Sequence, residues 1–458
     1  MLFNSLVFIF LFLPVTYLVF WALRSTPQRH VWLTITGYVF YAYWDVRFCL
    51  LMAFSTLVSY AAGRAFLRYG PRRWILWVPV SCDLALLGFF KYAGFFAETV
   101  NAVARAAHLG PLLPVLHVVL PVGISFYTFH TISYIVDCYR GVVRPTRSLF
   151  EFSAYVSLFS QLVAGPIVRF RQIESDLENL ASADRRAGLY AGSSFFVYGL
   201  VEKVLVADSL ARFVNPWLAD YTHLSSAATW LAMLGYSMQL YFDFSGYSSM
   251  AVGLGLMFGL RIPQNFNSPY RARDPSDFWR RWHISLSTCI RDYLFIPLGG
   301  SRGSKWLTVR NIMISMFLGG LWHGANFTFI VWGLYWGTLL ALYHLLGRYW
   351  DAFPARGVLM FVLALCGWVL FRATDLHMAG GVFARMFVPS SGVLPADWEL
   401  FLALAVLATL WSVFGPNAFE FHAPARPLVR VPLLGFVFGM TLAIIAGSRA
   451  SPFLYFQF

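Results

Sequence analysis

Residues 239–329 contain three motifs that place polar and aromatic side chains between long apolar runs: QLYFDFSGYSSMA (239–251), FWRRWHISLSTCIRDYLFIPLGG (278–300) and GGLWHGANFTF (319–329). Two histidines in these motifs, His283 and His323, lie forty positions apart, and each directly follows a tryptophan. The rest of the chain is apolar in windows long enough to cross about 30 Å of hydrocarbon. The sequence therefore predicts a membrane protein whose polar residues are concentrated in one internal region.

The composition supports this prediction over the whole length of the chain. Of its 458 residues, 59% are hydrophobic and 12% are charged, whereas a soluble domain carries about 25% charged residues. We expect an all-α polytopic protein with about eleven transmembrane helices plus re-entrant or interfacial helices. The net charge of +13 fits basic cytoplasmic loops. No nucleic-acid partner is expected, because no compact basic domain carries the charge.

Basic loops also predict the orientation of the chain. The apolar run 2–23 has no basic segment before it and no cleavage pattern, so we expect a retained helix with its N-terminus outside. Further spans are predicted near 31–44, 48–62, 75–96, 115–136, 189–206, 225–260, 309–346, 357–373, 398–414 and 431–447. Loops are predicted at 97–114 and 207–224, a re-entrant pair at 152–173, broken at Gly165-Pro166, and interfacial helices within 261–306.

Several classes of site are excluded by missing motifs. The sequence has no P-loop, no H-E-x-x-H and no G-x-S-x-G, so it offers no case for an ATPase, a zincin or an α/β-hydrolase. Its five cysteines are scattered and include no C-x-x-C pair. We therefore predict no disulfide framework, no metal site and no bound cofactor.

His323 is the strongest candidate for a catalytic group. It lies in an apolar region, where an ionisable side chain must be hydrogen-bonded or functional, and burial would keep the imidazole in the neutral form that a base needs. Gly319, Gly320 and Gly324 beside it are expected to leave room for a substrate. The alternative is a histidine hydrogen-bonded between packed helices.

The other candidates lie in the preceding motifs. His283 follows Arg280 and Arg281 on an expected interfacial helix, and it could be either a catalytic group or an interface histidine beside anchoring Arg and Trp residues. Asp243 is a carboxylate in an apolar helix. It is expected to pair with a nearby arginine, the alternative being that it orients a catalytic group.

These motifs, with YFDFSGYS (241–248) and PVGISFYTF (121–129), together resemble the membrane-bound O-acyltransferase family, and most of all its bacterial alginate O-acetyltransferase branch. The resemblance covers nearly the whole chain. It implies one membrane domain, 1–458, with 239–329 as its catalytic core, whose helices form a ring around a central tunnel. The family's W-H-G histidine matches His323, and its R-W-H histidine matches His283.

The resemblance also implies a reaction. An acetyl group would pass from a cytoplasmic thioester donor, with acetyl-CoA as co-substrate, to hydroxyls of an exported polysaccharide such as alginate. The transfer would be direct or would use a periplasmic acetyltransferase partner, and the protein would lie in the bacterial inner membrane. His323 would act as general base, while His283 would orient the reacting group or hydrogen-bond the thioester carbonyl. The predicted donor-binding residues are Arg280, Arg281, Trp282, Trp322, Asn326 and Asp243.

Two alternatives remain open at the level of sequence. A related acyltransferase could take a D-alanyl or other acyl group from a carrier protein to a cell-envelope polymer. A non-catalytic transporter of acyl groups would also have many spans with buried charges. Transporters, however, commonly carry internal repeats, and the sequence shows none of fixed period.

Overall fold

Helices form most of the protein in a computed structural model, which describes residues 1–116, 118–163, 165–420, 427–447 and 454. Between the helices these residues form no β-strand, only an isolated bridge that pairs Leu224 with Val393. The all-α prediction is confirmed. Internal contacts divide the chain into two compact units, Met1–Ser194 with Ala251–Pro263, and Phe195–Met250 with Gln264–Phe458. That residues 1–458 form one membrane domain stays a prediction.

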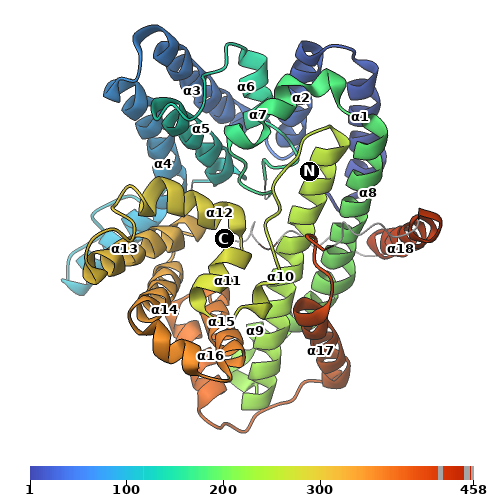
Figure 1. The fold of residues 1–458 in the computed structure, drawn as a ribbon. Coiled ribbons are helices and arrows are strands. Elements are labelled where there is room, and N and C mark those ends of the chain that lie inside the picture. Colours follow the sequence, from blue (N-terminus) through green and yellow to red (C-terminus); the bar gives the residue numbers. More distant parts are fainter. Residues whose placement is uncertain (117, 164, 421–426, 448–453, 455–458) are drawn as a thin grey trace. The chain divides into compact units, whose positions relative to one another are not determined.

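The first unit contains the N-terminal helices, coloured blue to green in Figure 1. Its helices are α1 (Leu13–Ala22), α2 (Thr26–Ala42), α3 (Cys49–Tyr69), α4 (Arg73–Ala106), α5 (Ile124–Tyr139), α6 (Leu149–Val156), α7 (Phe170–Glu178) and the start of α8 (Arg185–Val201). α3, α4 and α5 pack against one another, and α2 packs against α6. α5 begins directly after Gly123, whose φ of +76° lies in the left-handed region that favours glycine.

The second unit contains nearly all of the polar and aromatic motifs of residues 239–329. Its helices after α8 are α9 (Asp208–Ala219), α10 (Ser226–Met257, whose last turns belong to the first unit), α11 (Pro275–Arg281), α12 (Ile284–Ile290), α13 (Lys305–His323), α14 (Phe327–Ala352), α15 (Arg356–Arg372), α16 (Leu376–Phe387), α17 (Trp398–Phe414) and α18 (Pro427–Gly447). The segment 261–306, predicted to lie at the interface, holds the 3-10 turn η6 (Pro269–Arg271), α11, α12 and the π-helical turn η7 (Arg291–Phe295), all too short to span, before α13 begins at Lys305.

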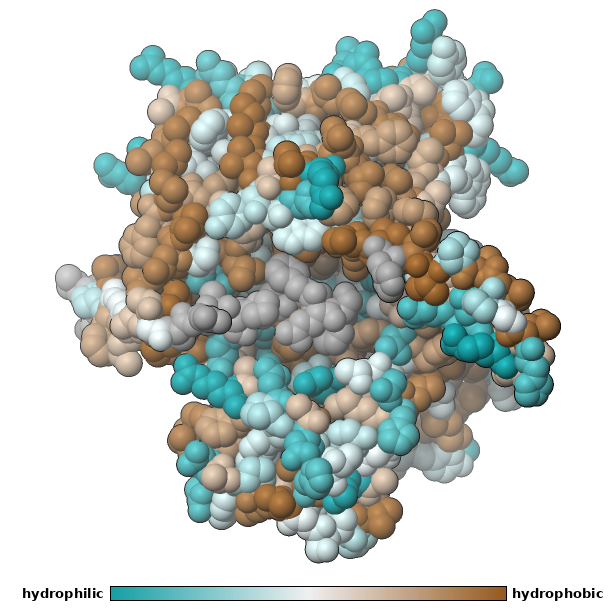
Figure 2. Space-filling model, turned by 180° about the vertical axis from the view of Figure 1, so that it is seen from behind, coloured by the Kyte–Doolittle hydropathy of each residue, from teal (hydrophilic) through white to brown (hydrophobic). Residues whose placement is uncertain are grey.

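Four helical segments in the described part of the chain are long and apolar enough to cross a membrane: Val46–Tyr69, Arg73–Ala106, Arg185–Ala219 and Phe327–Ala352. Shorter apolar helices cover Phe8–Ala22, Trp398–Phe414 and Val431–Gly447. Large apolar side chains are widely exposed, and Leu50 on α3 is 75% exposed. Figure 2 shows hydrophobic residues spread over the upper part of one face, with hydrophilic residues at its upper edge. These surfaces suit contact with lipid, and the number of spans stays a prediction.

Three predicted boundaries are wrong. The expected loop 97–114 is helical as far as Ala106, and the expected loop 207–224 is helical as far as Ala219, because both stretches continue the helix before them with an amphipathic pattern. The expected helix 115–136 begins only at Ile124, since Pro121 and Gly123 keep the residues before it out of the helix.

Candidate active site

His323 is the last residue of α13, in a helical hairpin whose second arm is α14. Asn326 begins α14, because its side-chain oxygen accepts a hydrogen bond from the Thr328 N–H at 3.1 Å. Its Nδ2 donates to the carbonyl of Thr374 at 2.7 Å, which ties the turn to the start of α16. Asn326 therefore fixes the hairpin turn next to His323 by hydrogen bonds to α14 and to the residues before α16.

Glycines let the two arms of the hairpin approach closely. A Cβ on Gly320 would lie 2.3 Å from the Phe329 carbonyl oxygen, and one on Gly333 would lie 2.4 Å from the Met316 carbonyl oxygen. The space beside Gly324 is filled by the Phe329 ring, which would lie 2.3 Å from a Cβ on that glycine. The expectation that Gly320 and Gly324 leave room for a substrate is wrong, because α14 occupies that room. Of these three glycines, Gly319 alone is among the described residues that line the cavity beside His323.

We expect Gly320→Ala to destabilise the protein by about 1–3 kcal/mol, because the methyl group can be accommodated only if two backbones separate. The measurement is the midpoint of thermal unfolding of the purified protein in detergent. Gly380→Ala in α16 is the matched control, since a Cβ there meets nothing within 4 Å. An unchanged midpoint for Gly320→Ala would show that the hairpin is not packed as described.

A cavity of about 860 Å³ opens beside His323. His323 is 7% exposed and packs its imidazole edge-on against Trp332 at 4.8 Å and against Phe371 at 5.1 Å between ring centroids. Trp332 also lines the cavity, so one of its walls is aromatic. The imidazole therefore meets the cavity at a largely water-excluded position.

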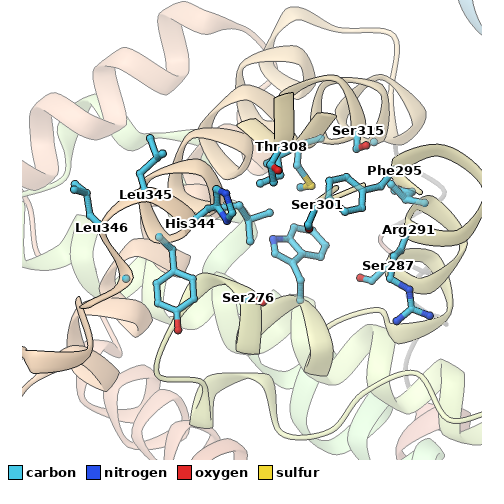
Figure 3. A pocket seen from close by; sticks show the side chains of 18 of the residues that line it. Ser276, Ser287, Arg291, Phe295, Ser301, Thr308, Ser315, His344, Leu345 and Leu346 are labelled. Atoms are coloured by element: carbon cyan, nitrogen blue, oxygen red, sulfur yellow. The ribbon is translucent and has the colours of Figure 1, made fainter. Parts of the chain in front are cut away.

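Cationic side chains line the same cavity at exposed positions. They are Arg291, Lys305 and Arg348, with His344 beside them. Arg291 pairs with Asp292 at 2.7 Å, whereas Lys305 and Arg348 have no carboxylate partner in the described part of the chain. In Figure 3, Ser287 and Arg291 lie on one side of the cavity, and His344, Leu345 and Leu346 lie on the other. The cavity thus joins a positively charged surface to His323.

His283 lies between α11 and α12 and is fully buried. Its φ of +43° turns the chain between the two short helices. The ring packs edge-on against Phe244 at 4.7 Å, and its centroid is 6.0 Å from that of Trp322, which in turn is 4.9 Å from the His323 ring. The two histidines therefore flank one tryptophan. His283 itself is not among the described residues that line the cavity.

The environment of His283 keeps the imidazole neutral. Both α11 and α12 have only seven residues and lie outside the membrane-spanning helices. Burial among aromatic rings lowers the pKa of His283 to about 3, because the charged form would lose its hydration. Its Nδ1 lies 3.1 Å from the side-chain oxygen of Asn265. A neutral imidazole with one hydrogen-bonded nitrogen is the form that can accept a proton or a hydrogen bond.

The predicted donor-binding arginines and tryptophans lie outside the cavity wall as far as the structure describes it. Arg280 and Arg281 both pair with Asp277, at 3.5 and 3.0 Å. Trp282 is buried, 4.6 Å from Trp368 between ring centroids. Trp322 contacts both histidine rings. A role for these four residues in donor binding stays a prediction, and the structure gives each of them a packing or pairing role.

Asp243 forms a buried ion pair, but its partner is a lysine and not the arginine that the sequence suggested. Its Oδ1 lies 2.5 Å from the Lys203 Nζ, and both side chains are 2% exposed. Its Oδ2 accepts a hydrogen bond from the Leu454 N–H at 2.9 Å. Lys203 also pairs with Asp208 at 2.7 Å. Lys203 lies in no recognisable sequence motif. The sequence therefore did not indicate that Asp243 would pair with Lys203 and not with an arginine.

Lys305, Arg291 and Arg348 were not selected as donor-binding residues from the sequence. They come from the start of α13, from η7 and from the end of α14, and no spacing rule connects these positions. These three residues could have been predicted as donor-binding residues from their positions at the ends of the helices that carry or face His323. Positive charge at a helix end beside an apolar run is also the ordinary sign of a membrane interface.

Comparisons with known proteins bear on the family of the chain. Residues 116–371 match the family model of the membrane-bound O-acyltransferases. A probable alginate O-acetylase of Pseudomonas putida is 40% identical, with the whole of both chains aligned. Another from Pseudomonas aeruginosa is 45% identical over 84% of this chain and 75% of its own. A peptidoglycan O-acetyltransferase of Helicobacter pylori is 35% identical over 84% of this chain and 80% of its own.

Proposed function

Because the chain belongs to the membrane-bound O-acyltransferase family, we propose that it is a multi-pass membrane enzyme that transfers acetyl groups from a cytoplasmic thioester to hydroxyls of a cell-surface polysaccharide. The relatives of Pseudomonas putida and Pseudomonas aeruginosa are named for O-acetylation of alginate, which makes alginate the first polysaccharide to test. The observation that carries the proposal is the cavity that joins an exposed cationic surface to His323.

In the proposed reaction, the two histidines have different roles. The oxygen of the polysaccharide hydroxyl attacks the carbonyl carbon of the acetyl thioester, and a C–O bond forms as the C–S bond breaks. His323 takes the hydroxyl proton and passes it to the departing thiolate, so the products are an acetyl ester and a free thiol. His283 either orients the hydroxyl or hydrogen-bonds the carbonyl oxygen as negative charge develops on it.

As the donor, acetyl-CoA would bring its phosphate groups to the cations of the cavity. Its phosphate groups are multiply charged anions, and Lys305 and Arg348 offer positive charge that no described carboxylate neutralises. The apolar and aromatic wall between them and His323 suits the less polar acyl arm. In this arrangement the cavity opens to the cytoplasm, the N-terminus lies outside, and the membrane is the bacterial inner membrane. A periplasmic partner could complete the delivery to the polymer.

We expect the double variant Lys305→Glu/Arg348→Glu to raise the KM for acetyl-CoA by about tenfold at low ionic strength while kcat changes little. The effect should shrink at high salt, because both charges are exposed and salt screens them. The measurement is the initial rate of acetyl transfer in membranes at two salt concentrations. Arg302→Glu is the control, since Arg302 is also exposed near Lys305 but is not among the described residues that line the cavity. Equal effects of the two charge changes would contradict the donor assignment.

A carrier-bound donor, as expected for D-alanyl transfer, is the second candidate. A teichoic acid D-alanyltransferase of Bacillus subtilis is 31% identical over 52% of this chain. The same cations would then meet the phosphate of a phosphopantetheine arm, and a folded carrier would dock at the exposed end of the cavity. Transfer that occurs with an acyl carrier protein, and not with acetyl-CoA, would identify this alternative.

A further inference from the structure

The Asn265 side chain holds three hydrogen-bond donors from the segment that contains His283. Its Oδ1 accepts the Ser285 N–H at 3.0 Å and the Ser285 hydroxyl at 2.9 Å, and it lies 3.1 Å from the Nδ1 of His283. The backbone carbonyl of Asn265 also accepts the Ile284 N–H at 2.9 Å. Asn265 is 2% exposed, so water does not compete for these bonds.

This geometry decides the protonation of the imidazole. A backbone N–H can only donate, so the atom of Asn265 that faces the Ser285 N–H must be the amide oxygen and not the amide nitrogen. The same oxygen faces His283 Nδ1, which must therefore carry the proton. In a neutral imidazole the other nitrogen, Nε2, then has a lone pair and no hydrogen.

The Nε2 of His283 is a buried acceptor without a hydrogen-bond partner in the described part of the chain. Buried polar atoms are nearly always paired, so such an atom points to a group that binds there. Of the rings around it, Phe244 and Phe266 carry no hydrogen-bond donor, and the indole N–H of Trp322 does not bond to Nε2. A hydroxyl is the chemical group in the proposed reaction that can donate to it.

We infer that Asn265 is a positioning residue: it fixes His283 as the Nδ1–H tautomer, so that Nε2 accepts a hydrogen bond from a second hydroxyl of the acceptor, next to the hydroxyl whose proton His323 takes. The inference rests on the proposed function and chooses between the two roles left open for His283. Hydrogen-bonding the thioester carbonyl would need a proton on Nε2, which the Asn265 contact excludes for the neutral ring. His283 thus serves the acceptor, while His323 lines the cavity assigned to the donor.

The test is a double-mutant cycle on the full-length protein in membranes, with radiolabelled acetyl-CoA and alginate as probes. Asn265→Ala is expected to lower kcat by about 10- to 100-fold, as for other groups that orient a functional histidine, and to leave the KM for acetyl-CoA unchanged. In a His283→Ala background the same substitution should have no further effect on kcat, because its target is already absent. A merely structural role would lower kcat by the same factor in both backgrounds.

Two further variants keep the test decisive. Asn265→Leu fills the same space without an acceptor, so it repeats the cycle if Asn265→Ala does not fold. Asn267→Ala is the control, because Asn267 lies two residues after Asn265, its side chain accepts a hydrogen bond from Asn417, and it has no hydrogen bond to either histidine among the described residues; it should keep wild-type kcat. Equal losses from Asn265→Ala with and without His283, or full activity of His283→Ala, overturn the inference while the proposed function stands. Absence of transfer by the wild-type protein overturns both.

Discussion

Replacing His323 by alanine is expected to lower acetyl transfer at least about a hundredfold, because a positioned general base contributes about 10²- to 10⁴-fold. His323 is the histidine that the cavity exposes to a bound donor, and no other imidazole among its described lining residues is buried. The measurement is the O-acetyl content of the secreted polysaccharide in cells that carry only the variant protein. The KM for the donor should change little, since the cations of the cavity remain.

The variant needs a control for packing as well as for chemistry. His323 contacts Trp332 and Phe371, so alanine leaves a gap that could loosen the hairpin. His323→Gln fills more of that space without a base of comparable strength, and it should be as inactive as the alanine variant. His377→Ala, at an exposed site on α16, should keep full activity. Wild-type acetylation by either His323 variant, with normal protein levels, would remove His323 from the mechanism.

Replacing Lys203 by methionine is expected to destabilise the protein by about 3–5 kcal/mol, because two carboxylates lose their counter-ion and one of them is buried. Lys203 pairs with Asp243 inside the second unit, and the other oxygen of Asp243 holds the Leu454 N–H. Such a loss is comparable to the whole stability of many domains, so the variant should fail to accumulate in the membrane. The measurement is the amount of folded protein recovered by gel filtration in detergent.

A second substitution tests whether the loss of stability in Lys203→Met comes from the unpaired carboxylate of Asp243. Asp243→Leu added to Lys203→Met removes the stranded carboxylate, and it should recover a large part of the folded protein. Asp208→Asn should cost much less than Lys203→Met, because Asp208 is 19% exposed and Lys203 keeps Asp243. If the double variant is no more stable than Lys203→Met, the buried ion pair is not the cause of the loss.

The sequence predicted those helices whose apolar runs end in clear polar or glycine-rich boundaries. α17 occupies residues 398–414 as predicted, and α15 differs from its predicted range by one residue at each end. α9 was missed because its polar residues resemble a loop when hydropathy is averaged over a window. Its apolar residues Leu210, Val214 and Leu218 recur at helical spacing and are buried.

The site was less predictable than the helices, for a physical reason. His283 and His323 could be selected one by one, because each is an ionisable group in an apolar context. Their shared contact with Trp322 depends on how α12 meets α13, which no spacing in the sequence specifies. For the same reason Asn265 could not be chosen: its amide acts through a turn at His283 that exists only because φ there is positive.

The most direct test of the account uses the purified protein in liposomes, with acetyl-CoA on the cavity side and alginate on the other. Both the free thiol released and the acetyl ester formed on alginate are measured over time, with a periplasmic acetyltransferase added if the polymer alone is not modified. The account predicts one ester for each thiol with the wild-type protein, and neither product with His323→Ala. Ester formation at the wild-type rate by His323→Ala would contradict it, because the acetyl group would then be passing through a protein whose histidine takes no part in the transfer.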